Sequence, residues 1–215
     1  MALEIETKFQ VKSPEIFDRI RTEKQVASYA LVEKQAILQC DTYFDSPEGL
    51  LFHQGASLRL RAKGGEYLVT FKSQVKGNQV RTEIEMPITT SQAQKLWRGD
   101  LVSVRCEATQ AAMSYVEIQA IVPVLSVENN REAWFINSEI GRVKICFDDV
   151  QYTMPDRNQC QYVKEYELEL ELKEGEDTFL QELTHALSQQ YDLVPNLQSK
   201  YERGVRILNV FSKAN

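Results

Sequence analysis

The sequence predicts an α+β protein built on a large antiparallel β-sheet or barrel with helices beside it. Apolar and polar residues alternate in many short segments, and residues typical of turns separate these segments. Apolar residues at helical spacing occur in fewer places, for example at residues 177–190. We expect residues 1–215 to form a single domain, because no linker, repeat or low-complexity segment interrupts the pattern.

Each expected strand is a short run in which apolar and polar residues alternate. These strands cover residues 3–11, 33–45, 56–63, 66–73, 80–88, 122–127, 130–136, 142–150 and 165–172. Gly64-Gly65 and Lys76-Gly77-Asn78 provide turns between consecutive strands.

Helices are expected where a capping residue precedes apolar residues at helical spacing. Ser13 and Pro14 supply an N-cap and an N1 proline for a helix that ends near Tyr29. Thr90 can cap a helix through Trp97. The remaining expected helices cover residues 107–116, 177–190 and 199–211.

The charge of the chain argues against general binders of nucleic acids or membrane surfaces. The sequence has 31 acidic and 25 basic residues, which gives a net charge of −6, and its pI is near 5.2. No apolar run approaches the ~20 residues that a membrane span needs, and the N-terminus lacks the pattern of a signal peptide. The four cysteines form no C-x-x-C pair. We therefore expect a cytoplasmic protein with no nucleic-acid or membrane partner.

On each expected strand the charged residues occupy alternate positions, either all odd or all even, and this shared parity puts them on one face. The opposite parity of the same strands is mainly apolar. The charged positions are Glu4, Glu6 and Lys8; Arg59, Arg61 and Lys63; Arg81, Glu83 and Glu85; Lys144 and Asp148; and Glu165, Glu167, Glu169 and Glu171.

A sheet with one solvated face would produce the same alternation without any site. Two features favour a site instead. Acidic and basic residues are segregated by strand, with Glu-x-Glu near each end of the sequence and Arg-x-Arg in the middle. Neighbouring glutamates on one strand face also repel each other, because like charges about 4 Å apart cost roughly 1 kcal/mol in water and about 4 kcal/mol at an effective dielectric near 20.

A divalent cation would relieve the repulsion among these glutamates. An anion with several charges would do the same for the clustered Arg and Lys side chains. Carboxylate oxygens suit Mg²⁺, which commonly binds through one or two carboxylates together with substrate phosphates. The charge pattern therefore predicts a site for a metal ion and a phosphate compound.

Ordered motifs along nearly the whole chain resemble those of the CYTH superfamily, also called triphosphate tunnel metalloenzymes. The first is Glu4-Ile5-Glu6-Thr7-Lys8, the Glu-x-Glu-x-Lys strand with which that family begins. The others, in order, are Asp41 to Pro47, Gly55 to Arg61, Thr70 to Lys72, Arg81 to Glu85, Arg131 to Trp134, Asp148, Glu167 to Leu172 and Ser199 to Gly204. Within the superfamily the chain is most similar to bacterial inorganic triphosphatases, and we expect a CYTH domain without the helical CHAD domain that often follows it.

The resemblance implies a closed eight-stranded antiparallel β-barrel, the triphosphate tunnel, with charged side chains inside and helices outside. Its basic residues would bind the triphosphate, and the matching positions are Lys8, Arg59, Arg61, Lys72, Arg81, Arg131 and Lys200, with Lys144 added by its parity. Its acidic residues would hold Mg²⁺ or Mn²⁺, and the matching positions are Glu4, Glu6, Glu169 and Glu171, with Asp148 and Glu167 as further candidates.

The activity that the resemblance implies is metal-dependent hydrolysis of inorganic tripolyphosphate to pyrophosphate and phosphate. Catalysis of this reaction is mostly positioning and charge neutralisation. Lys8 and Arg59 would neutralise charge on the substrate, and Glu169 would help to orient the attacking water.

Several alternatives stay open at this point. Thiamine triphosphatases, nucleoside or RNA triphosphatases and class IV adenylate cyclases use a triphosphate in the same kind of tunnel. A sensor that binds triphosphate or polyphosphate without hydrolysis would need the basic residues but not a full acidic set. A lipocalin-like barrel would need an apolar interior.

Overall fold

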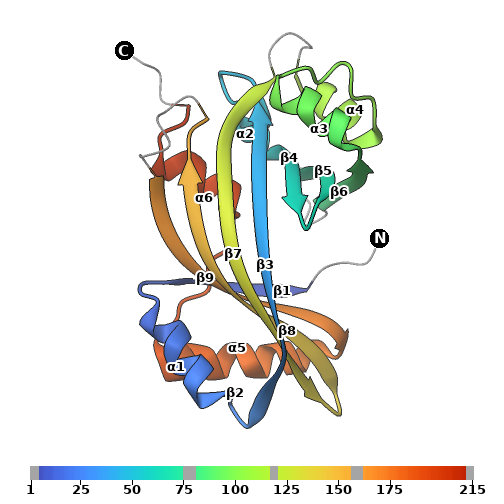
Figure 1. The fold of residues 1–215 in the computed structure, drawn as a ribbon. Helices are drawn as coiled ribbons and strands as arrows, with labels where there is room; N and C mark the ends of the chain where they lie inside the picture. The colour runs from blue at the N-terminus through green and yellow to red at the C-terminus, as the bar shows by residue number, and fades with distance from the viewer. Residues whose placement is uncertain (1–4, 75–80, 117–120, 156–161, 212–215) are drawn as a thin grey trace. The chain divides into compact units, whose positions relative to one another are not determined.

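The computed structural model describes residues 5–74, 81–116, 121–155 and 162–211 (Figure 1). Its strands are β1 (Glu6–Val11), β2 (Gln25–Val26), β3 (Tyr29–Asp45), β4 (Ala56–Lys63), β5 (Glu66–Gln74), β6 (Arg81–Ile88), β7 (Val122–Ser138), β8 (Gly141–Thr153) and β9 (Tyr162–Gly175). Its helices are α1 (Glu15–Glu23), α2 (Leu50–His53), α3 (Thr90–Trp97), α4 (Glu107–Met113), α5 (Asp177–Tyr191) and α6 (Lys200–Ile207).

Several expected elements differ in extent from the observed ones, β7 and α1 among them. β7 is one strand, whereas two strands separated near residue 128 were predicted. The polar residue Asn129 resembles a turn residue in the sequence, yet it is only 3% exposed inside the strand, two positions from Arg131 and of the same parity. Helix α1 ends at Glu23 instead of near Tyr29, because Lys24 adopts a left-handed conformation with φ of 52°.

The expected closed eight-stranded barrel was also wrong. The nine described strands form an antiparallel sheet in the order β1-β9-β8-β7-β3-β4-β5-β6, and β2 pairs with β3. Among the described residues, β1 and β6 at the two ends of this order are not paired with each other. Alternation specifies which residues share a face, but closure depends on pairing between the first and last strands, which a one-strand pattern does not encode.

The described chain divides into two compact units, each with its own hydrophobic core. The first unit comprises Met1–Leu38, Asn129–Val150 and Lys164–Gln198, and the second comprises Gln39–Glu128, Gln151–Val163 and Ser199–Asn215. The long strands β3, β7, β8 and β9 contribute residues to both units.

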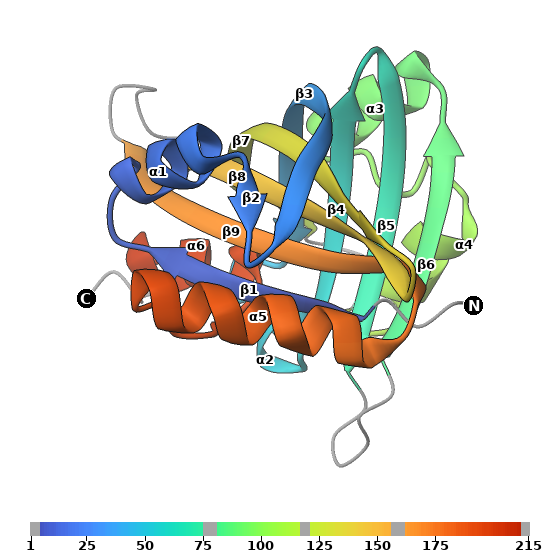
Figure 2. The ribbon, with the colours of Figure 1, turned by 90° about the horizontal axis from the view of Figure 1, so that it is seen from below.

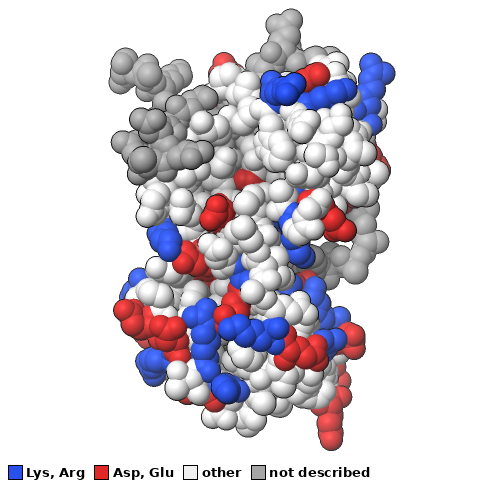
Figure 3. All heavy atoms as spheres, in the orientation of Figure 1, with Lys and Arg blue, Asp and Glu red and all other residues white. Residues whose placement is uncertain are grey.

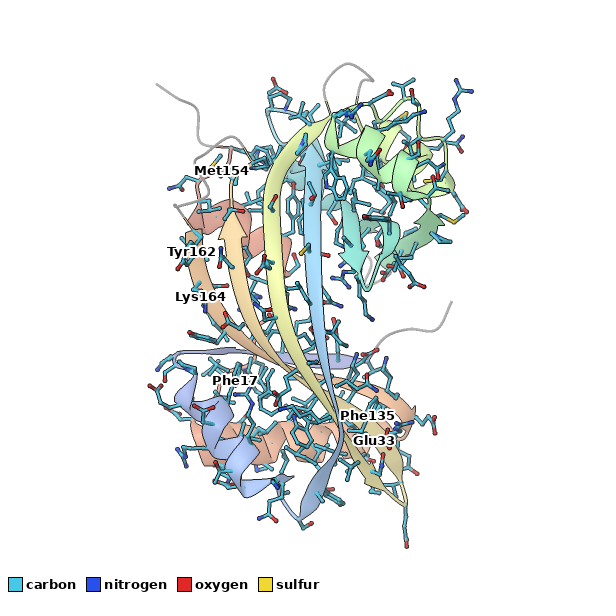
Figure 4. All side chains as sticks on the ribbon, viewed as in Figure 1. Phe17, Glu33, Phe135, Met154, Tyr162 and Lys164 are labelled. Carbon is cyan, nitrogen blue, oxygen red and sulfur yellow. The ribbon has the colours of Figure 1, made fainter. Side chains whose placement is uncertain are left out.

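In the first unit, α1 and α5 cover the apolar face of the strands. Figure 2 shows α5 running alongside β1, and the hydroxyl groups of Thr184 and Thr7 are hydrogen-bonded at 3.3 Å between them. Phe17 of α1, labelled in Figure 4, packs edge-on against Phe147 of β8 with ring centroids 5.2 Å apart. Because this face holds the core, the charged parity of the same strands is directed away from it.

In the second unit, α3 and α4 pack on the apolar face of β4, β5 and β6. Capping boxes begin both α3 and α6, with Thr89 and Gln92 at the first and Ser199 and Glu202 at the second. Helix α6 also belongs to this unit, and Gly204 lets it approach β7 and β8 closely. A Cβ atom at Gly204 would lie 2.7 Å from side-chain atoms of both Leu125 and Tyr152.

Replacing Gly204 with alanine is therefore expected to destabilise the protein by about 1–2 kcal/mol, even though alanine is the better helix former. Leu125 and Tyr152 are fully buried, so a methyl group at residue 204 forces one or both of them to shift within the core. Urea denaturation followed by circular dichroism measures the change. Arg206→Ala on the exposed side of α6 is the control and is expected to cost less than ~0.5 kcal/mol. Equal stability of the Gly204→Ala variant and the wild type would contradict this account of the helix contact.

The face of the molecule in Figure 3 carries both signs of charge, interspersed over α1 and the strands near it. Ion pairs such as Arg21 with Asp18 at 3.1 Å and Lys34 with Glu132 at 2.7 Å account for part of this mixture. Within the described ranges, no helix combines the length and apolar character that crossing a bilayer requires.

Candidate functional site

Three glutamates in the middle of β9 are buried, although they lie on the face opposite the hydrophobic core. Glu167, Glu169 and Glu171 are 1%, 7% and 9% exposed, and the alternate residues Leu168 and Leu170 lie in the core of the first unit. A simple solvated sheet face would leave these carboxylates in water. Their burial therefore favours a site over the solvated-face explanation, because a buried carboxylate needs a cation or hydrogen-bond donors.

Arg131 of β7 holds two of the acidic side chains of the first unit. Its Nε and Nη2 atoms donate to the two carboxylate oxygens of Asp148 at 2.7 Å each, and Nη2 also donates to Glu169 at 3.0 Å. Burial by itself would lower the pKa of Arg131, but the charges of Asp148 and Glu169 raise this pKa well above its ordinary value. The guanidinium therefore stays charged and fixes both carboxylates in place.

Three carboxylates of this unit are grouped closely enough to share one cation. One oxygen from each of Asp148, Glu167 and Glu169 lies within 4.8 Å of the others. Oxygens around a single Mg²⁺ or Ca²⁺ lie up to about 4–5 Å apart, since metal–oxygen distances are about 2.0–2.6 Å. The three carboxylates and the Arg131 guanidinium carry a formal charge of −2, which a divalent cation would neutralise. The donor set thus fits a hard divalent ion.

Lysine side chains lie on the same charged face. Lys8 of β1 is directly opposite Glu169 in the strand register, and its Nζ atom is 2.6 Å from Glu6. The Nζ atom of Lys144 is 3.9 Å from Glu171, which also accepts a hydrogen bond from Lys173. The first unit therefore brings together the predicted residues Glu6, Lys8, Arg131, Lys144, Asp148, Glu167, Glu169 and Glu171, while Glu4 lies outside the described residues.

The second unit contains the predicted arginines of β4, arranged around a buried aspartate of β3. Arg61 binds the two carboxylate oxygens of Asp41 through Nε and Nη2 at 2.7 Å each. Arg59 lies 3.7 Å from Asp41, donates to Thr70 at 3.0 Å and lies 3.5 Å from Glu85. Its Nε atom is buried without a partner among the described residues. A buried donor without a partner is uncommon in folded proteins, and a bound anion is one explanation for it.

The other predicted basic residues of this unit are Lys72, Lys200 and Arg81. Lys72 of β5 pairs with Glu83 at 2.9 Å. Lys200 is the first residue of α6, and its charge acts on Asp41 together with those of Arg59 and Arg61. Arg81 begins β6, opposite Gln74 in the register, and its side chain lies outside the described part of the chain.

Asp41 lies in one of the family motifs, but the sequence alone assigned it no role at the site. A signal was available, because Asp41, Tyr43 and Asp45 share one parity on the expected strand. The register confirms the common face, since Asp41 is opposite Arg61 and Tyr43 is opposite Arg59. Asp41 supplies the counter-charge that lets two arginines lie side by side on β4.

The ion pairs of Asp41 predict a pH-dependent contribution to stability. Burial by itself would raise the pKa of Asp41, but the hydrogen bond from Arg61 and the charges of Arg59, Arg61 and Lys200 lower it below the ordinary value of 3.8. A lowered carboxyl pKa stabilises the folded protein above the ordinary value, and this stabilisation is lost as pH falls through the folded-state pKa.

We therefore expect Asp41→Asn to destabilise the protein by about 2 kcal/mol at neutral pH. The difference from the wild type is expected to remain constant down to about pH 4 and to shrink at lower pH. Denaturation curves of both proteins between pH 7 and pH 2.5 measure it. A difference that grows on acidification would contradict the assignment.

One family model matches nearly the whole chain. The CYTH domain family matches residues 2–204. The inorganic triphosphatase of Haemophilus influenzae is 25% identical over 213 residues, which cover 95% of this chain and 54% of that protein. The chain thus spans about half the length of this curated relative.

Solved structures show the same fold at lower identity. A candidate adenylate cyclase from Bacillus halodurans is 18% identical with a TM-score of 0.66, and the match covers 94% of this chain and 96% of that one. A candidate adenylyl cyclase from Hippeastrum, described as having a dominant triphosphatase activity, is 16% identical with a TM-score of 0.64, covering 95% and 96%. With a family match over nearly its full length, a fold shared with these proteins, and the family's charged motifs on its strands, this chain belongs to the CYTH family.

Proposed function

We propose that this chain is a metal-dependent triphosphatase that hydrolyses inorganic tripolyphosphate to pyrophosphate and phosphate. The observation that supports the proposal is that acidic and basic side chains form two separate groups in the protein. One group of carboxylates fits a divalent cation, and a separate group of arginines includes a buried donor without a partner. Hydrolysis of a phosphoanhydride needs both kinds of group, because the substrate carries several negative charges and the reaction adds charge at the leaving oxygen.

The proposed acidic site consists of Asp148, Glu167 and Glu169, with Glu4, Glu6 and Glu171 as further ligands. The ion in it, Mg²⁺ or Mn²⁺, would supply charge neutralisation for the phosphates and a more acidic bound water. Arg131 already makes three hydrogen bonds to Asp148 and Glu169, so we assign it mainly to holding these carboxylates. Glu169 is the carboxylate that we assign to orienting the attacking water.

The proposed phosphate-binding residues are Lys8, Arg59, Arg61, Lys72, Arg81, Lys144 and Lys200. Arg59 can donate through its unpaired Nε atom and through its Nη atoms, which gives it the forked geometry that suits a phosphate. The lysines would act as point charges. The relative named inorganic triphosphatase supports a small inorganic substrate. We also propose that both compact units belong to a single CYTH domain, which the family match over residues 2–204 supports.

Phosphate release from a substrate panel tests this function. Tripolyphosphate, ATP and thiamine triphosphate are each incubated with the protein in Mg²⁺, in Mn²⁺ and in chelator. We expect tripolyphosphate to be hydrolysed at least ~10-fold faster than the organic triphosphates, and chelator to abolish the reaction. If ATP or thiamine triphosphate is hydrolysed faster than tripolyphosphate, that compound is the preferred substrate and the proposed one is wrong. If the protein binds tripolyphosphate but does not hydrolyse it with either metal, the proposed triphosphatase function is wrong and the protein is a triphosphate sensor.

A further inference from the structure

A buried carboxylate at the end of β3 lies outside both groups described above. Asp45 is 0% exposed, and among the described residues it has no cation within ion-pair distance. One of its oxygens accepts hydrogen bonds from the backbone N–H groups of Ser46 at 2.7 Å and Leu51 at 2.8 Å. The other accepts from the backbone N–H of Phe52 at 2.9 Å and from the hydroxyl of Tyr201 at 2.8 Å.

Three of these four donors belong to the same short stretch of backbone, whereas the fourth comes from α6. The hydrogen bonds from the three backbone N–H groups to Asp45 stabilise the chain between β3 and the end of α2, which is a local structural role. Tyr201 is 156 residues away in the sequence, so its bond to Asp45 ties α6 to the end of β3. Burial raises the pKa of both Asp45 and Tyr201. Tyr201 therefore remains a neutral hydroxyl donor.

The ring of Tyr201 also packs against two other aromatic rings. It stacks on Tyr43 with centroids 4.7 Å apart and an interplanar angle of 12°, and it meets the ring of Phe52 nearly at right angles at 5.8 Å. Tyr43 lies opposite Arg59 in the strand register. The ring of Tyr201 thus lies over the face of β3 that also carries Asp41 and Asp45.

Lys200 immediately precedes Tyr201 in the first turn of α6, so any shift of Tyr201 moves Lys200 with it. The charge of Lys200 acts on Asp41 and Tyr43, and Asp41 is the carboxylate that Arg61 binds and that Arg59 approaches to 3.7 Å. We propose that Asp45 and Tyr201 are positioning residues that hold Lys200 next to Arg59 and Arg61 for phosphate binding. This inference rests on the proposed function, and it adds two residues that touch neither metal nor phosphate.

The first test is a double-mutant cycle on tripolyphosphate binding. Calorimetry in chelator gives the Kd without turnover, and the KM in Mg²⁺ gives a second reading. Lys200→Ala is expected to weaken binding about 10- to 100-fold, the scale of one charged hydrogen bond. Tyr201→Phe keeps the ring stacking, removes only the hydroxyl, and is expected to weaken binding about 5- to 10-fold with a smaller change in kcat.

The decisive comparison is Tyr201→Phe in the Lys200→Ala background. If the hydroxyl acts through Lys200, its loss changes the Kd less than 2-fold there. If the Tyr201 hydroxyl has a purely structural role, Tyr201→Phe changes the Kd by the same factor with and without Lys200, and the proposal is overturned. An unchanged Kd and KM for Tyr201→Phe alone would also overturn it. Asp45→Asn keeps the size of the side chain but replaces one acceptor oxygen with an amide donor, which also removes a backbone hydrogen bond. It is therefore expected to weaken binding at least as much as Tyr201→Phe.

Tyr191→Phe is the matched control. Tyr191 lies on α5 in the first unit, and its hydroxyl donates to the carboxylate of Glu23 at 3.0 Å. This variant loses the same kind of bond and is expected to leave the Kd unchanged. If Lys200→Ala alone leaves both Kd and KM unchanged, the positioning proposal fails, whereas phosphate release by the wild type continues to test the proposed function separately.

Discussion

Arg59→Ala is expected to reduce tripolyphosphate hydrolysis at least ~100-fold, the scale of losing one preorganised charge contact in an active site. Arg59 contributes a buried Nε donor without a partner, and its other donors face Thr70 and Asp41. The fold is expected to survive the change, because Asp41 keeps its two hydrogen bonds from Arg61. Steady-state phosphate release in Mg²⁺ measures the rate, and thermal unfolding verifies that the variant is folded.

Two further variants sharpen this prediction. Arg59→Lys keeps the positive charge but loses the forked donor, so we expect a rate between those of the wild type and Arg59→Ala. Lys63→Ala is the matched control, since Lys63 has the same parity on β4 but is exposed at its end. It is expected to change the rate less than ~2-fold. A near-wild-type rate for Arg59→Ala would remove Arg59 from the substrate site. Lys8→Ala is expected to show a loss as large as that of Arg59→Ala.

Arg131→Met is expected to destabilise the folded protein by about 3–5 kcal/mol when metal is absent. Methionine fills much of the same volume but leaves Asp148 and Glu169 without their cation. Asp148 is 0% exposed and Glu169 is 7% exposed, so loss of the guanidinium leaves negative charge in a buried environment. Chemical denaturation in chelator measures the free energy of unfolding. Because a divalent cation would bind the same carboxylates, we expect Mg²⁺ to raise the melting temperature of this variant more than that of the wild type.

The control for this prediction is Arg142→Met in the same unit. Arg142 pairs with Glu33 at 2.8 Å, but both side chains are more than a third exposed. Figure 4 labels Glu33 and also Phe135, whose ring lies 4.1 Å from the Arg142 guanidinium. Loss of this exposed pair is expected to cost about 1 kcal/mol or less. If Arg131→Met costs no more than Arg142→Met, the carboxylates are not held by Arg131 in the way described here.

The sequence by itself determined which residues share a strand face. Period-two alternation predicts that Arg59 and Arg61 share one face of β4 and that Glu167, Glu169 and Glu171 share one face of β9, and the structure confirms these faces. The capped helices α3 and α6 begin within one residue of their expected starts, because capping is a local interaction between residues three apart. These features depend on neighbours along the chain, so one sequence suffices to predict them.

Only the tertiary structure decided how the strands associate and which charges pair. Alternation does not specify whether β1 meets β6, and the expected barrel is an open sheet among the described strands. The pairing of Arg61 with Asp41, of Arg131 with Asp148 and of Tyr201 with Asp45 joins residues 20, 17 and 156 positions apart. Such pairs form because burial makes an unpaired charge costly, and burial is a property of the packed chain that no local pattern records.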